Sequence, residues 1–147
     1  MTLNEWAVLH RDEAIGELAS AQEIKGLLAL MQRELMDAGK SLSLDGRFSH
    51  AFWACLTIAR IALRACGYRL RSAAHHYRAI ESLEYTLSID PHVVRNLQAF
   101  RAKRVHAEYE AADFITPLEL EEVMQLAEEL QRILLNWLRI EHRDLLA

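Results

Sequence analysis

The stretch GRFSHAFWACLTIARIALRAC, residues 46–66, is the most regularly patterned part of this 147-residue chain. Apolar side chains recur in it every three or four residues, which is the period of an α-helix with a buried face. The stripe consists of Phe48, Phe52, Cys55, Leu56, Ala59, Ala62, Leu63 and Cys66. Its alanines let neighbouring backbones approach closely, so we expect this helix to lie at the centre of a bundle. Gly67 follows directly, where a helix commonly ends.

Two start signals predict two helices before this stretch. Thr2-x-x-Glu5 and Ser20-x-x-Glu23 each have the form of a capping box, in which a hydroxyl and a carboxylate bond the free N–H groups of the first turn. The first signal predicts a short helix that ends near residue 16. The second predicts a helix over residues 20–39, followed by a loop over residues 40–45.

Three further helices are predicted after the stretch. Residues 68–71 form a basic connection, and Ser72 is expected to cap a helix that ends near residue 89. The dipeptides Asp90-Pro91 and Thr116-Pro117 each place a cap before a proline at the first helical position, which predicts helices up to about residues 111 and 142. No strand pattern or internal repeat stands out. The chain is therefore predicted to be a single all-α domain, an antiparallel bundle of five to six helices with short connections.

The composition is that of a globular protein and places limits on function. Hydrophobic residues make up 52% and charged residues 26% of the chain, which argues against a disordered protein. The formal net charge is −4, so any contact with nucleic acid requires a local basic patch. Arg60 and Arg64 interrupt the most apolar run, so no membrane span is expected. We expect no leader sequence and a cytoplasmic location.

The sequence predicts neither a metal site nor a cofactor. Its histidines are scattered, and the adjacent His75 and His76 would point about 100° apart on a helix. Cys55 and Cys66 lie on one predicted helix, about 16 Å apart along its axis, which is too far for a disulfide. Both are expected to be small core residues. No HExxH motif and no glycine-rich phosphate loop occurs.

The segment RAKRVHAEY, residues 101–109, carries the candidate site. A rotation of about 100° per residue predicts an apolar stripe along the helix that contains it. The same rotation places Arg101, Arg104 and Glu108 on the stripe side, and Lys103 and His106 opposite. Charge on a buried stripe costs free energy unless it is paired.

Two interpretations of these charges are open. Arginines that continue a buried stripe can line a cleft or a subunit interface, where the planar donor fork of guanidinium suits a phosphate. The simpler interpretation is a solvated helix with an ordinary ion pair between Arg104 and Glu108.

The order of these features resembles the HEPN domain, an all-α module named for higher eukaryotes and prokaryotes nucleotide-binding. The resemblance covers roughly residues 27–137. It includes SHAFWACLTIARIALRACGYR, HHYRAIESL and RAKRVHAEY, followed by a Glu-rich amphipathic helix. HEPN proteins resemble one another mainly through an Arg-x4–6-His motif on a late helix, in some members ending in Tyr. Arg101-x4-His106 fits this pattern, and so does Arg104-x4-Tyr109.

The resemblance implies a homodimer that brings two copies of the motif together, and metal-independent cleavage of RNA. In such a site Arg101 and Arg104 would hold the phosphate, and His106 or Tyr109 would be the general acid or base. Of these two, histidine titrates closer to neutral pH. The implied setting is a toxin–antitoxin or defence system, with an antitoxin or a nucleotidyltransferase as partner. The alternative is a non-catalytic helical module that binds a nucleotide or a protein partner.

Overall fold

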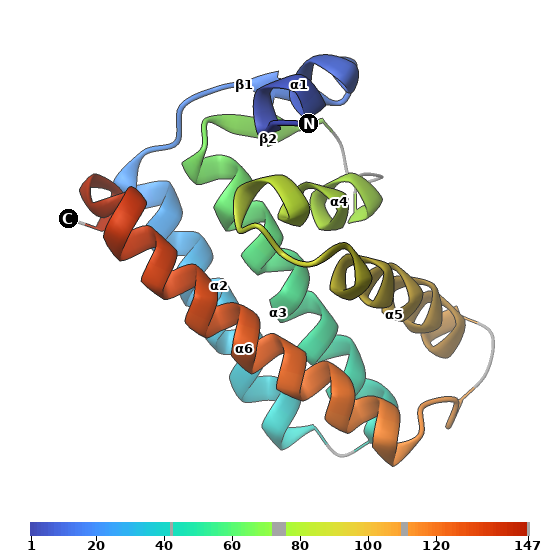
Figure 1. Cartoon of the computed structure of the whole chain (residues 1–147). Helices are drawn as coiled ribbons and strands as arrows, with labels where there is room; N and C mark the ends of the chain where they lie inside the picture. Colours follow the sequence, from blue (N-terminus) through green and yellow to red (C-terminus); the bar gives the residue numbers. More distant parts are fainter. Residues whose placement is uncertain (42, 72–75, 110–111, 147) are drawn as a thin grey trace.

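Helices make up nearly all of the regular structure (Figure 1). The computed structural model describes residues 1–41, 43–71, 76–109 and 112–146, with the backbone alone for residues 107–109. The elements in chain order are α1 (Leu3–Leu9), β1 (Ala14–Gly16), α2 (Ala21–Lys40), α3 (Leu44–Ala65), β2 (Tyr68–Leu70), α4 (His76–Thr86), α5 (Pro91–Tyr109), α6 (Pro117–Glu141) and the 3-10 helix η1 (Arg143–Leu146). The all-α bundle is confirmed, with six α-helices in the described part of the chain.

Helix α3 lies at the centre of the bundle, as its pattern predicts. It packs against α2, α6, α4 and α5, which surround it in Figure 1. Residues 51–64 are buried except for Trp53, which is half-buried, and Arg60, which is exposed. A helix that is apolar on nearly all sides is a central element rather than a surface one. Within the described ranges, no helix is long and apolar enough to cross a membrane.

Of the two predicted capping boxes, the one at α1 is complete, and a further complete box stands at α6, where the sequence predicted a cap before a proline. At α1, the Thr2 hydroxyl accepts from the Glu5 N–H, and the Glu5 carboxylate bonds the Thr2 N–H in return. Thr116 and Glu119 form the same reciprocal pair at α6, with distances of 3.2 and 3.0 Å. At α2 the Ser20 hydroxyl accepts from the Glu23 N–H at 3.1 Å. The Glu23 carboxylate, however, bonds Arg64 on α3. Glu23 therefore pairs with a residue of another helix instead of completing the predicted capping box.

The other helix ends follow the predicted signals closely. The Asp90 carboxylate accepts from the His92 N–H at 2.7 Å and caps α5. Ser43 caps α3, so this helix begins two residues earlier than predicted. Gly67 has a φ of 89°, a conformation that a side chain makes costly. The predicted cap at Ser72 lies outside the described residues.

A two-stranded antiparallel ribbon joins the N-terminal region to the end of α3, and the sequence did not predict it. Ala14 lies opposite Leu70, and Gly16 lies opposite Tyr68. The first helix ends at Leu9 rather than near residue 16, and the connection after α3 is strand β2. Three-residue strands are too short to show an alternating pattern, and their pairing depends on segments far apart in the chain.

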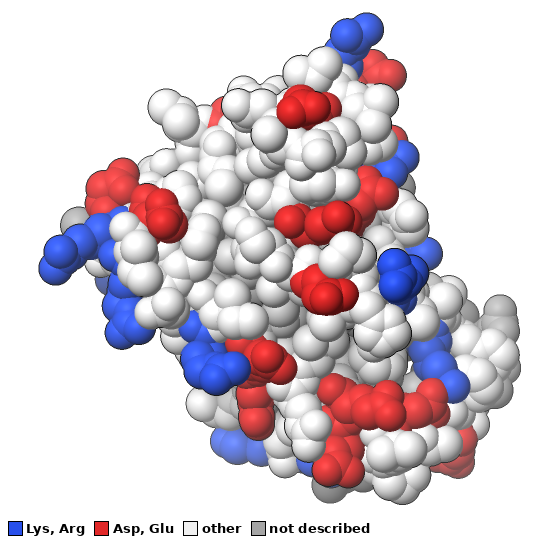
Figure 2. Space-filling view, in the orientation of Figure 1, with Lys and Arg blue, Asp and Glu red and all other residues white. Residues whose placement is uncertain are grey.

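The face of the molecule drawn in Figure 2 has acidic groups across its centre and lower right, whereas Lys and Arg lie mostly near its edges. A nucleic-acid backbone requires a basic surface. This face does not offer a broad one, so contact with nucleic acid there would depend on individual arginines and lysines.

Leu97 tests the packing of α5 against the core, because its side chain is fully buried there. Leu97→Ala is expected to lower the free energy of unfolding by about 2–5 kcal/mol, since it removes buried methyl groups and leaves a cavity. The matched control is Leu118→Ala, at a position on α6 that is 64% exposed. It should change stability by less than about 0.5 kcal/mol in chemical denaturation. Equal losses in the two variants would contradict this placement of α5.

Candidate functional site

Arg104 lies inside the bundle, where the helical rotation predicts it. Its side chain is 7% exposed. The guanidinium carbon lies 4.9 Å from the centre of the Trp53 ring and 5.5 Å from that of Phe52. Both rings belong to α3, so cation–π contacts connect α5 to the central helix. In this chain Arg104 therefore serves first as an anchor for α5.

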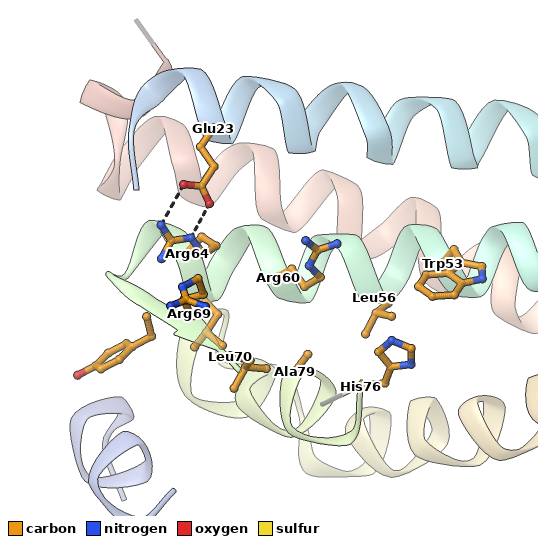
Figure 3. Close-up of a pocket in the computed structure, with 11 residues that line it drawn as sticks. Glu23, Trp53, Leu56, Arg60, Arg64, Arg69, Leu70, His76 and Ala79 are labelled. Atoms are coloured by element: carbon orange, nitrogen blue, oxygen red, sulfur yellow. Dashed lines mark hydrogen bonds and ion pairs between the residues drawn. The ribbon is translucent and has the colours of Figure 1, made fainter. Parts of the chain in front are cut away.

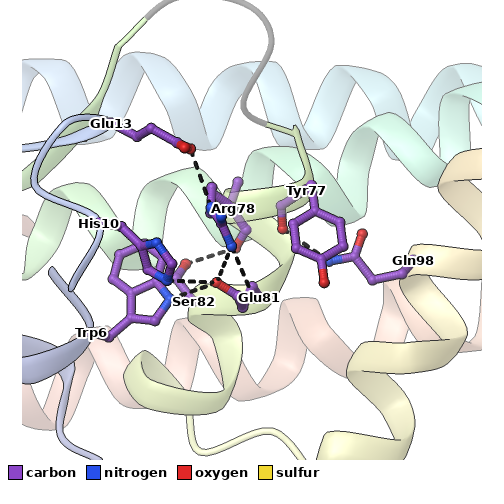
Figure 4. Close-up of polar contacts among 9 residues, drawn as sticks. Trp6, His10, Glu13, Tyr77, Arg78, Glu81, Ser82 and Gln98 are labelled. Carbon is purple, nitrogen blue, oxygen red and sulfur yellow. Dashed lines mark hydrogen bonds and ion pairs between the residues drawn. The ribbon is translucent and has the colours of Figure 1, made fainter.

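Arg101 is half-buried and faces α4. Its guanidinium donates to the Gln98 side-chain oxygen at 3.2 Å and lies 5.6 Å from the Tyr77 ring. The Gln98 amide donates to the Tyr77 carbonyl at 2.9 Å (Figure 4). Arg78 lies 5.5 Å from the same ring, which is 44% exposed. We call Tyr77, Arg78, Gln98 and Arg101 the Tyr77 cluster.

His106 and Lys103 face the segment between α5 and α6. The His106 ring centre lies 3.7 Å from that of Phe114, and the Lys103 ammonium lies 4.8 Å from it. Lys103 also forms an ion pair with Glu119. Both side chains are half-buried. The helical rotation correctly separates them from Arg104, but they contact protein rather than open solvent.

Asp45 at the start of α3 fixes the segment that carries Phe114. Its carboxylate accepts from the Asp113 N–H at 2.8 Å and the Ile115 N–H at 3.1 Å. Burial raises the pKa of Glu119, but bonds from Lys103 and Thr116 outweigh it and hold that pKa below its usual value. The segment 112–116 is therefore held to α3 by Asp45 and contacts α5 through Phe114.

Helix α5 directs its candidate residues toward three different neighbours. Arg101 contacts α4, Arg104 contacts α3, and His106 contacts Phe114. Successive positions rotate by about 100°, so nearby residues on one helix separate in this way. Tyr109 ends α5, but its side chain and that of Glu108 lie outside the described residues. The three described candidate side chains, of Arg101, Arg104 and His106, therefore do not gather around a single point within one chain.

A second group of arginines lines a cavity of about 460 Å³ between α3, β2 and α4 (Figure 3). Arg64 and Arg69 lie toward one end together with Glu23, and Arg60 lies nearer the middle. Trp53, Leu56 and His76 lie toward the other. The sequence contained one signal for this site: Arg60 and Arg64 are four residues apart and so share a helix face. In the sequence these two arginines stand out only as interruptions of an apolar run.

Arg64 is held rigidly at the basic end of this cavity. Its side chain donates to both Glu23 carboxylate oxygens, at 2.6 and 3.0 Å, and to the Glu17 carbonyl at 2.7 Å. The residue is only 6% exposed. Hydrogen bonding to Glu23 raises the pKa of the Arg64 guanidinium, which therefore remains charged. The more exposed Arg69 pairs with the Glu17 carboxylate at 2.9 Å.

A polar network joins α1 to α4 beside the Tyr77 cluster (Figure 4). The Trp6 indole donates to the Glu81 carboxylate at 2.8 Å, and His10 lies 3.4 Å from the same oxygen. Arg78 bonds Glu81 at 3.0 Å and Glu13 at 3.2 Å. The network fixes Arg78 in place and offsets its charge with two carboxylates.

Thiol and metal chemistry find no support in the described part of the chain. No group of three His, Cys, Asp or Glu side chains among those residues could hold a metal ion. Cys55 is buried as predicted, whereas Cys66 is only half-buried. Burial raises the pKa of Cys55 to about 12 and that of Cys66 to about 11. Both thiols are therefore protonated at neutral pH and are poor nucleophiles.

The pairing of Glu23 with Arg64 predicts a pH-dependent stability. The bond from Arg64 lowers the pKa of the Glu23 carboxyl more than burial raises it, and nearby arginine charges lower it further. The ionised carboxylate thus stabilises the fold above the usual carboxyl pKa of about 4.3. That stabilisation is lost as the pH falls through the lowered pKa of Glu23 in the folded chain.

The measurement compares the free energies of unfolding of the native chain and Glu23→Gln over a range of pH. The native chain should be more stable near pH 7, because the variant leaves the buried Arg64 charge without its carboxylate. The difference should begin to narrow below a pH of about 4, where Glu23 binds a proton in the unfolded chain, and should be lost below the lowered pKa of the folded chain. A difference that stays constant over this range would show that the pair does not stabilise the fold.

Comparison with models of known protein families, with curated proteins and with solved structures finds no match for this chain.

Proposed function

We propose that this chain is an RNA-binding helical module that resembles HEPN domains and binds single-stranded RNA along α4 and α5. The observation that carries the proposal is the Tyr77 cluster. Tyr77 offers an exposed aromatic ring, and the guanidinium groups of Arg78 and Arg101 lie against it. Single-stranded RNA is commonly bound by stacking its bases on aromatic rings beside cations that contact the phosphates.

The two arginines of the cluster differ in the charge that they offer a ligand. Arg78 is paired with Glu13 and Glu81, so most of its charge is already offset. Arg101 donates to the neutral amide of Gln98, a bond that leaves its charge uncompensated. Arg101 is therefore the phosphate-binding residue of this proposal, and Tyr77 is the stacking platform.

A second aromatic group extends this surface toward the end of α5. Phe114 lies against His106 and Lys103, as Tyr77 lies against the arginines. Glu119 offsets the charge of Lys103, and His106 contributes an imidazole to this surface. An RNA strand that follows α5 from Tyr77 would pass this imidazole.

Metal-independent cleavage of RNA is the activity that we propose for a dimer of this chain. The ribose 2′-oxygen attacks the adjacent phosphorus and loses its proton to a base, while an acid protonates the departing 5′-oxygen. His106 or Tyr109 would take these roles, and Arg101 would stabilise the charge on the phosphate. Arg104 would support the site by holding α5 against Trp53. Two copies of α5 would have to meet, because one chain directs Arg101 and His106 toward different neighbours.

The proposed setting is a cytoplasmic toxin–antitoxin or defence system, with an antitoxin or a nucleotidyltransferase as partner. The alternative function is a non-catalytic module that binds a nucleotide or a protein partner. It predicts a stable dimer or complex without RNA turnover.

Binding is tested with a short single-stranded RNA, by fluorescence anisotropy over a series of salt concentrations. Tyr77→Ala should weaken binding by about 1–3 kcal/mol through the loss of one stacked base. Arg101→Gln should weaken binding and reduce the dependence of log K on log salt by about 0.7, the value for one phosphate contact. Arg95→Gln removes a charge at an exposed position of the same helix and is the control. Equal losses of RNA affinity in Arg101→Gln and Arg95→Gln would show that the total charge of the helix, rather than a contact of Arg101, determines binding.

Cleavage is tested by incubating the dimeric protein with RNA in EDTA and looking for 2′,3′-cyclic phosphate ends. His106→Ala should lower the rate by about 10²–10⁴-fold if the imidazole is the acid or base. Arg101→Ala should also lower it, whereas Arg95→Ala should not. Equal background cleavage by all the proteins would remove the nuclease function and leave the binding module.

A further inference from the structure

We propose that the cavity between α3, β2 and α4 is a separate site for a phosphomonoester joined to a planar ring. The cavity is distinct from the Tyr77 cluster, and none of the four candidate residues on α5 lines it. Its volume of about 460 Å³ fits a small molecule, since such sites commonly measure about 300–1,000 Å³. The sequence and the proposed RNA surface leave this site without a role.

The charges that line the cavity favour an anionic ligand. Three guanidinium groups line it, from Arg60, Arg64 and Arg69, and Glu23 is the one carboxylate among the lining residues. Glu17 offsets part of this charge from beside the cavity through its pair with Arg69. The two carboxylates leave one of the three positive charges unpaired, and this excess favours an anion such as a phosphomonoester. Guanidinium is also the side chain best suited to phosphate geometry.

Arg60 is the arginine most available to such a ligand. It projects from α3 between Arg64 and Trp53 (Figure 3). Its side chain is exposed, although the helix around it is buried on nearly all sides. In the described part of the chain Arg60 forms no hydrogen bond or ion pair, whereas Arg64 and Arg69 are both paired. A charge without a pair, next to a rigid arginine, can bind an anion without first breaking another contact.

The other end of the cavity is suited to a planar and partly apolar group. Trp53 is half-buried, and its ring meets that of His76 edge to face at a centre distance of 5.2 Å. Leu56 and Ala79 close the floor, and both are almost fully buried. Aromatic and aliphatic walls of this kind bind a flat ring by stacking and desolvation. A ligand that spans the cavity would place its ring here and its phosphate near Arg60.

A terminal phosphate offers more charge and more free oxygens to the arginines than a phosphate within a nucleic-acid strand does. A phosphodiester needs an exit for the chain on both sides, whereas a phosphomonoester ends at its phosphate. This chemistry is shared by a free nucleoside monophosphate and by the 5′-phosphorylated end of an RNA. The experiment below distinguishes these two sources.

The test measures binding of AMP, adenosine and inorganic phosphate to the full chain by isothermal titration calorimetry. AMP should bind more tightly than either fragment, because only AMP engages both ends of the cavity. Arg60→Gln should weaken AMP binding by about tenfold or more through the loss of a charge-assisted bond. Arg95→Gln, at an exposed position on α5, should leave it unchanged. The proposal would be overturned if AMP did not bind, or if adenosine bound as tightly as AMP. Equal effects of Arg60→Gln and Arg95→Gln on AMP binding would also overturn it.

A competition experiment then identifies the source of the phosphate. If a 5′-phosphorylated RNA displaces AMP and the 5′-hydroxyl form does not, the site accepts RNA ends. If neither RNA displaces AMP, the site is specific for free nucleotides. Displacement by both forms alike would contradict recognition of a phosphomonoester. Tyr77→Ala should weaken RNA binding without affecting AMP, so failure of the RNA proposal can be distinguished from failure of this one.

Discussion

Helix α3 is enclosed by protein on nearly every side, and the positions of the other elements follow from this enclosure. Its apolar surface cannot be covered by one neighbour, so α2, α6, α4 and α5 all pack on it. The small side chains of Ala51, Ala54, Ala59 and Ala62 allow those helices to approach closely. Helix α5, which carries the candidate residues, is placed by this packing.

Charged residues in so apolar an environment need compensation, and two buried arginines obtain it in different ways. Arg64 bonds both oxygens of Glu23 and a backbone carbonyl, so its charge is held by a carboxylate from α2. Arg104 lies against the rings of Phe52 and Trp53 on α3. The first arrangement fixes the wall of a cavity, and the second fixes α5. The cavity and the position of α5, which we assign to function, thus both depend on contacts that offset a buried arginine charge at α3.

The sequence predicted the features that depend on local chemistry. Thr2 and Thr116 cap their helices as expected, because a capping box requires only residues three positions apart. Arg104 points inward because helical rotation alone decides its direction. Glu23 departs from its expected role because Arg64, far along the chain, competes for its carboxylate.

Features that join distant segments were beyond sequence reasoning. The contact of His106 with Phe114 depends on Asp45, which fixes the segment after α5 from the start of α3. The β ribbon pairs the segment before α2 with the segment after α3. The arginine cavity combines side chains from α2, α3, β2 and α4. No local pattern contains such information.

Trp53 connects the two proposed sites physically. Its ring meets the guanidinium of Arg104 on α5 and the imidazole of His76 at the cavity. A ligand in the cavity affects α5 only if it binds one position of the Trp53 ring more tightly than another. A ligand with equal affinity for both positions does not change their populations. Phe52, which also contacts Arg104, is fully buried and limits how far the guanidinium can follow a movement of Trp53. The half-buried ring of Trp53 is thus the contact that the two proposed sites share.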